Sequence, residues 1–254
     1  MTTIIEERLK ALDSIPLLRG AHDSNEQMCA MEAAAWIAGE EHSDRPRCVS
    51  PVLGAFVRSW NDALDDEERQ ALKPCIPRMI GTAGDGHDEE RAWMAVDWLV
   101  RVCTPAWLDL AGLKDSAEAL RSLPPITKAT VGKAQPTVKE AREAAVAAAK
   151  DAAAGDATWA VFRARDAARN AVRAAAGDAA WAAVRARTAV WHAGDDAWAA
   201  AWNAAGDAAW AAAVKAKLDS EPRFAPVKAE LHRSAHELLA RMIDGPFGGE
   251  DTHE

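Results

Sequence analysis

Hydrophobic positions in the first 123 residues recur three and four residues apart, which is the period of one face of an α-helix. The clearest runs are Met28, Met31, Ala35 and either Ile37 or Trp36; Val52, Phe56 and Trp60; and Trp93, Val96, Val100 and Cys103. Strict alternation of apolar and polar residues, the pattern of a half-buried strand, is hard to find. The pattern therefore predicts about six short helices and no sheet in this half of the chain.

Residues that begin and end helices stand beside these runs. Four segments match the capping box, in which the N-cap side chain and a Glu or Gln three residues later bind each other's backbone amides. They are Thr3–Glu6, Ser24–Gln27, Asp115–Glu118 and Thr137–Glu140. Ser50-Pro51 and Thr104-Pro105 place an N-cap residue before a proline of the first turn. Helix ends are expected at Gly39, Gly112 and Gly245, where a left-handed residue can close the helix.

A stretch bounded by prolines divides the chain. Residues 124–136 show no helical period, so we predict a linker there between an N-terminal helical domain, 1–123, and a second domain, 137–254. Within residues 137–218 there is no proline and 37 of 82 residues are alanine, which favours helix strongly. The last helix is expected at Val227–Asp244, with Leu231, Leu238, Leu239, Met242 and Ile243 buried.

The alanine-rich segment contains four glycine-aspartate pairs, at Gly155, Gly177, Gly194 and Gly206, each with a tryptophan four residues after the glycine. Glycine can end one helix while aspartate caps the next. The fold class predicted is therefore all-α, with two helical subdomains, the second an irregular Ala/Trp-rich antiparallel helical bundle. One alternative stays open, because on an unbroken helix the six tryptophans would share a stripe of about 120°.

Charge narrows the choice of partners. The chain carries 30 Lys and Arg against 39 Asp and Glu, a net charge of −9, which disfavours binding to the phosphates of nucleic acid. No apolar run approaches the roughly 18 residues that a membrane span needs, and the start lacks the core of a signal peptide. We expect a cytoplasmic protein without a membrane span.

Four cysteines, Cys29, Cys48, Cys75 and Cys103, are too widely spaced for a zinc finger or ribbon. The spacing favours reduced thiols packed as small apolar residues, with no metal and no cofactor. Two alternatives depend on distances that spacing does not give. One is a zinc site of Cys29, His42 and Cys48, and the other is a nucleophile pair of Cys75 and His87.

Several short motifs lie between residues 24 and 113. They include Met28-Cys-Ala-Met-Glu32, Cys48-Val-Ser-Pro-Val-Leu53, Trp60-Asn-Asp62, Asp97-Trp-Leu-Val-Arg101 and Pro105-Ala-Trp-Leu. Together they resemble a family of uncharacterised proteins of actinobacteria and their phages. The resemblance implies an actinobacterial or mobile-element setting, and it carries no activity, fold or site residues.

A group of polar residues could line a cleft, with His87 as the acid or base and arginines holding an anion. The group comprises Asn61, Asp62, Arg78, Asp85, His87, Arg91, Asp97 and Arg101. In the alternative interpretation, Asp97 and Arg101 are an ordinary pair on one helix and residues 84–87 are an ordinary loop. The chain contains no phosphate loop, no G-x-S-x-G and no H-E-x-x-H.

The second domain supplies candidates for binding. Arg165, Arg169 and Arg173 recur every four residues beside tryptophans, although interleaved aspartates favour an ordinary solvated face. Trp198 and Trp202 lie one turn apart in a short predicted helix and are the candidate anchors for a partner. The sequence thus favours a non-enzymatic protein–protein interaction module. The alternative is an enzyme that uses a polar N-terminal cleft around Asp62, Arg78 and His87, and self-association stays open.

Overall fold

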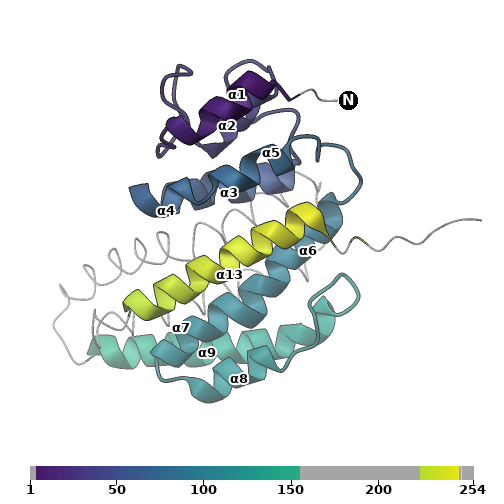
Figure 1. Cartoon of the computed structure of the whole chain (residues 1–254). Coiled ribbons are helices and arrows are strands. Elements are labelled where there is room, and N and C mark those ends of the chain that lie inside the picture. Colours follow the sequence, from purple (N-terminus) through teal and green to yellow (C-terminus); the bar gives the residue numbers. More distant parts are fainter. Residues whose placement is uncertain (1–3, 155–223, 246, 248–254) are drawn as a thin grey trace, which may run out of the picture. The chain divides into compact units, whose positions relative to one another are not determined.

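The computed structural model describes residues 4–154, 224–245 and 247 of the chain. These residues are helical and contain no β-strand, and an isolated bridge joins Leu17 to Met28 (Figure 1). The prediction of an all-α fold is therefore confirmed. The four Gly-Asp junctions of the predicted bundle lie outside the described residues.

The chain divides into two compact units, each with its own core. The described part of unit 1 comprises residues 4–92, 236–245 and 247, and that of unit 2 comprises residues 93–154 and 224–235. Within the described residues, the boundaries between the units fall inside α6, after Ala92, and inside α13, after Ala235.

Unit 1 is built from short helices. They are α1 (Glu6–Ala11), the 3-10 helix η1 (Leu12–Ser14), α2 (Ala30–Ile37), α3 (Pro51–Ala63), α4 (Asp66–Gln70), the 3-10 helix η2 (Lys73–Cys75) and α5 (Ile76–Met79). The first turn of α6 (Asp88–Trp98) and the end of α13 (Phe224–Asp244) complete the unit. Helix α2 packs against α1, α3 and α5, and every residue of α2 except Trp36 is buried. A helix that is apolar on all sides belongs in a core, and α2 lies in the core of unit 1.

Unit 2 contains the rest of α6, the π-helix η3 (Leu99–Cys103), α7 (Thr104–Leu110), α8 (Lys114–Arg121) and α9 (Val131–Ala154). The start of α13 also belongs to it. Helix α7 packs against η3 and α8, and α8 packs against α9. The wide π turn precedes Pro105, which has no N–H to donate back along the helix.

Local signals placed several helix ends correctly. The Ser50 hydroxyl accepts hydrogen bonds from the amides of Val52 (3.2 Å) and Leu53 (3.4 Å), so the cap of α3 is confirmed. Gly39, Gly112 and Gly245 have φ of 73°, 78° and 74°, and each follows a helix end as expected. The predicted apolar faces are buried, as are the five residues named for the last helix.

Several predicted helix starts were wrong. Asp115 lies inside α8, whose N-cap is Leu113, and Thr104 continues directly from η3 without capping α7. Ser24–Gln27 begins no helix, and the capping box that opens α2 is instead Cys29–Glu32, with a thiol in the N-cap position. Helix α9 begins at Val131 rather than Thr137 and contains Pro136. The Thr130 hydroxyl stabilises the segment that leads into α9. It accepts a hydrogen bond from the Thr127 amide at 2.8 Å and donates one to the Pro125 carbonyl at 2.6 Å.

Candidate functional site

The eight residues of the predicted polar cleft fall into groups with different partners. Asn61 and Asp62 bind the loop before α2, Arg78 pairs with Asp244, and Asp85 and Arg91 pair beside His87. Asp97 and Arg101 belong to unit 2, where they form an i, i+4 pair with 3.1 Å between Arg101 Nη1 and Asp97 Oδ1. Asp97 also accepts the Ile126 amide at 2.7 Å.

Arg91 is the best-held member of the predicted cleft, because its side chain is 0% exposed. Its Nη1 and Nη2 donate to the two carboxylate oxygens of Asp85 at 2.7 and 2.5 Å. Its Nε donates to the Met242 carbonyl at 2.8 Å, and Asp88 lies 3.5 Å from Nη1. The guanidinium therefore joins the loop before α6 to the end of α13, and its charge is balanced inside unit 1.

The Asp85 carboxylate is ionised and balances the charge of Arg91. Burial alone would raise its pKa, yet the hydrogen bonds from Arg91 and from the His87 amide (3.1 Å) hold the pKa below its usual value. Asp85 therefore stays ionised and acts as the counter-ion of Arg91.

His87 lies against the C-terminal segment. Its imidazole stacks on the Phe247 ring with centroids 4.0 Å apart and an angle of 8° between the planes. The Arg91 guanidinium carbon lies 5.0 Å from the centroid of the same ring. One face of the imidazole is therefore covered by Phe247.

Asn61 and Asp62, at the end of α3, hold backbone rather than a ligand. The Asn61 amide donates to the Leu18 carbonyl at 2.9 Å and its oxygen accepts from the Ala30 amide at 3.2 Å. Asp62 accepts the Gly20 amide at 2.8 Å. These three bonds fasten the loop between η1 and α2.

The same loop carries a polar cluster that the sequence reasoning missed. Glu32, 1% exposed, accepts the backbone amides of His22 (2.6 Å) and Cys29 (2.7 Å) and the His22 Nδ1 hydrogen (2.8 Å). His42 Nε2 lies 3.5 Å from Glu32 and 2.8 Å from the His22 carbonyl oxygen. The available signal was one glutamate in the otherwise apolar run 30–35.

Glu32 remains ionised in this buried position. Burial would raise its pKa, but the hydrogen bonds from the Cys29 amide and from His22 outweigh it and lower the pKa. Because an ionised carboxylate only accepts, His22 carries its hydrogen on Nδ1 and, when neutral, leaves the lone pair on Nε2. The His22 side chain is 13% exposed, so the pair resembles an oriented proton acceptor.

The cysteines behave as core residues. All four are buried and free, as predicted. Burial raises the pKa of Cys29, Cys48 and Cys103 to about 12, and it also raises the pKa of Cys75. These thiols are therefore protonated near neutral pH, which argues against the Cys75–His87 nucleophile pair. Among the described residues no group of three or more His, Cys, Asp or Glu side chains is arranged to hold a metal ion.

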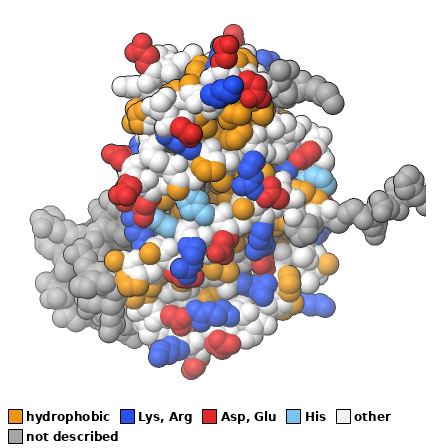
Figure 2. Space-filling model, viewed as in Figure 1, with side chains coloured by type: hydrophobic (Ala, Val, Ile, Leu, Met, Phe, Trp, Pro, Cys, Tyr) orange, Lys and Arg blue, Asp and Glu red, His pale blue; other side chains and the backbone are white. Residues whose placement is uncertain are grey.

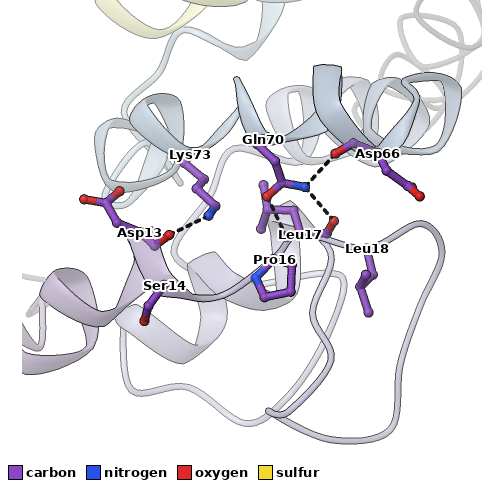
Figure 3. Close-up of a pocket in the computed structure, with 8 residues that line it drawn as sticks. All are labelled: Asp13, Ser14, Pro16, Leu17, Leu18, Asp66, Gln70 and Lys73. Atoms are coloured by element: carbon purple, nitrogen blue, oxygen red, sulfur yellow. Dashed lines mark hydrogen bonds between the residues drawn. The ribbon is translucent and has the colours of Figure 1, made fainter.

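A hollow of about 450 Å³ lies where the segment after η1 meets α4 and η2 (Figure 3). Gln70 lies in the hollow, with its side-chain amide bonded to both the amide (2.9 Å) and the carbonyl (3.0 Å) of Leu17. Lys73 Nζ donates to the Asp13 carbonyl at 3.0 Å. The Asp13 and Asp66 carboxylates point away from Gln70 in Figure 3. The Gln70 and Lys73 side chains thus bind backbone groups of the protein itself.

The face drawn in Figure 2 and the comparisons with known proteins add no further site among the described residues. On the face that Figure 2 shows, acidic and basic side chains are intermingled. None of the described helices is long and apolar enough to cross a membrane. Comparison with family models, curated proteins and solved structures found no match to this chain. The predicted binding residues Arg165, Arg169, Arg173, Trp198 and Trp202 lie outside the described residues.

Proposed function

We propose that this chain is a non-enzymatic module that binds another protein. The observation that supports this most is the environment of Arg91, one of the arginines of the alternative catalytic cleft. Its side chain is fully buried, and its donors are directed to Asp85 and to the Met242 carbonyl. Three of its five N–H donors bind Asp85 and the Met242 carbonyl, and a buried arginine used in this way supports the fold.

The proposed binding surface is the tryptophan-rich segment. Six of the eleven tryptophans of the chain lie between residues 155 and 223. Tryptophan and arginine are the residues that most often carry the binding energy of protein interfaces. We assign the anchor roles to Trp198 and Trp202, and supporting roles to Arg165, Arg169 and Arg173.

The test is partner capture from native lysate with the full-length chain as bait. We expect Trp198→Ala/Trp202→Ala to lose the captured protein while its helicity stays unchanged, because one interface anchor contributes about 2 kcal/mol or more. Trp198→Phe/Trp202→Phe is the matched control and should retain part of the capture. Equal capture by wild type and both variants would contradict the proposal. Recovery of the untagged chain itself would identify self-association.

A second candidate function rests on the His22–Glu32 pair. A buried carboxylate that fixes one imidazole nitrogen is how proton-transfer enzymes orient a general base. This candidate moves the acid–base chemistry from His87 to His22. It predicts that any hydrolysis found in a screen of ester, amide and phosphoester substrates falls about 10²- to 10⁴-fold in His22→Ala. Hydrolysis that survives in this variant would rule the candidate out.

A further inference from the structure

The C-terminal end of the described chain places an aromatic ring between a histidine and an arginine. Phe247 stacks on His87, with ring centroids 4.0 Å apart, and lies 5.0 Å from the Arg91 guanidinium carbon. We call His87 and Arg91 the aromatic clamp. The contact combines stacking with a cation–π interaction, both of which are specific for an aromatic side chain.

The clamp is held in place by bonds that do not involve Phe247. Asp85 binds both Nη atoms of Arg91 and accepts the His87 amide, and the Arg91 amide donates to the His87 carbonyl at 3.0 Å. The Arg91 guanidinium and the His87 backbone are therefore fixed to one carboxylate and to the first turn of α6. A site that is organised before its ligand arrives needs little ordering on binding.

Phe247, in contrast, lies three residues after the end of α13 at Asp244. Gly245 ends α13 with φ of 74°, a conformation that side chains disfavour. A Cβ at Gly245 would also overlap the Phe247 ring and its backbone nitrogen. The ring thus packs close to the end of the last helix, and Phe247 is half-buried.

We propose that the aromatic clamp is a binding site for a phenylalanine-bearing segment of another polypeptide, and that Phe247 is its exchangeable internal ligand. The geometry supports this because Arg91 and the His87 backbone are held without the ring, the specific contacts are made to the ring, and the ring follows the end of α13 at Asp244 by three residues. The site uses no residue of the tryptophan-rich segment, so this inference is tested independently of the proposed function.

The chemistry of the clamp defines the class of partner. The charge of Arg91 is balanced by Asp85 and Asp88, so the clamp selects for a ring rather than for an anion. The chain's own ligand also shows what precedes the ring, a glycine and a proline. We therefore expect a partner that presents phenylalanine on a glycine- or proline-containing turn.

The experiment supplies the ligand in trans. A fluorescein-labelled peptide with the sequence of residues 243–249, Ile-Asp-Gly-Pro-Phe-Gly-Gly, is titrated with full-length protein and followed by fluorescence polarisation. Wild type should bind the peptide weakly, because Phe247 competes from within the same molecule. Phe247→Ala, with its clamp vacated, should bind the peptide more tightly than wild type.

Two controls make the result specific. Adding His87→Ala to the Phe247→Ala chain should weaken binding about three- to tenfold, the usual contribution of one aromatic pair. A peptide with alanine in place of phenylalanine should not bind. Phe247→Leu, which keeps most of the apolar volume, replaces Phe247→Ala if that variant loses helicity by circular dichroism. Absence of saturable binding to the folded variant, or equal binding of the alanine peptide, would overturn the proposal.

Discussion

Glu32 and Arg91 are buried charges of opposite sign in unit 1, and they are held in different ways. Glu32 accepts hydrogen bonds from His22 and Cys29, ten and three residues earlier in the chain. Arg91 binds Asp85, six residues earlier, and also the Met242 carbonyl, 151 residues later. The anion therefore organises one local loop, whereas the cation connects the middle of the chain to its last helix.

This difference separates local from global stability. A local cluster can open while the rest of the unit stays folded, since proteins open in units of different stability. A contact between distant segments is lost only when those segments separate. Removal of Glu32 should therefore release a loop, and removal of Arg91 should weaken unit 1 as a whole.

The largest effect is expected for Arg91→Met. The substitution leaves Asp85 ionised beside an apolar side chain and the Met242 carbonyl without its donor. Breaking a buried pair by removing one partner typically costs about 3–5 kcal/mol of unfolding free energy. Urea denaturation followed by circular dichroism measures the change.

The matched control for Arg91→Met is Arg78→Met. Arg78 pairs with Asp244 near the same end of α13, but its side chain is 41% exposed. Exposed pairs contribute about 0–1 kcal/mol, so this variant should be close to wild type. Equal destabilisation by both variants would contradict the special role of Arg91.

A smaller effect, confined to one loop, is expected for Glu32→Gln. The amide side chain keeps the size of glutamate but replaces the charged acceptor of three N–H groups by a neutral one. Hydrogen bonds to charged groups contribute about 1.5–3 kcal/mol, and we expect a loss of stability of this order. Hydrogen exchange should accelerate at His22 and Cys29, whose amides bind the carboxylate.

Glu26→Gln is the control for Glu32→Gln, because Glu26 lies exposed in the same loop. It should leave both stability and exchange unchanged. If Glu32→Gln instead accelerates exchange throughout α3 and α5, the cluster is not local and the comparison with Arg91 fails.

The sequence predicted the helices better than it predicted these charges. The faces of α3 and α6 and the end of α2 at Gly39 follow from spacing and from single residues, which are local signals. Asp85, His87 and Arg91 were grouped because they are near neighbours in the chain. Met242 and Phe247 were not associated with them, because nothing local indicates a contact across 151 residues.

Glu32 escaped prediction for a different physical reason. Its capping box has a cysteine in the N-cap position, whereas the usual pattern has Ser, Thr, Asp or Asn. The Ser24–Gln27 match, which has the usual residues, begins no helix. The loop needs a buried acceptor for its backbone amides, and this tertiary requirement outweighs the local preference for Ser, Thr, Asp or Asn at the N-cap. The requirement becomes visible only in the folded structure.

The response to acid should sharpen the comparison further. Asp85 and Glu32 both have pKa values below their usual ones in the folded chain. A depressed pKa contributes stability that is fully present above the unfolded pKa of about 4 and is lost as pH falls through the folded value. Unfolding free energy should therefore be flat from pH 7 to 5 and decline below about pH 4.

The two carboxylates can be separated in the same acid titration. Glu32→Gln removes its own contribution, so its stability should decline less steeply in acid than that of wild type. Glu26→Gln again serves as the control and should follow wild type. Parallel curves for wild type and Glu32→Gln would show that Glu32 does not titrate with a depressed pKa.

The smallest effect expected is that of Phe247→Leu, and it tests whether Arg91 depends on the ring beside it. Leucine retains apolar contact but loses the stacking on His87 and the cation–π contact, together about 0.5–1.5 kcal/mol. Because Asp85, Asp88 and the Met242 carbonyl still hold the guanidinium, the loss should stay well below that of Arg91→Met. Thermal unfolding of both variants and of wild type gives the ratio of the two losses of stability. If Phe247→Leu costs as much as Arg91→Met, then the ring, and not the carboxylates, holds the buried cation in place.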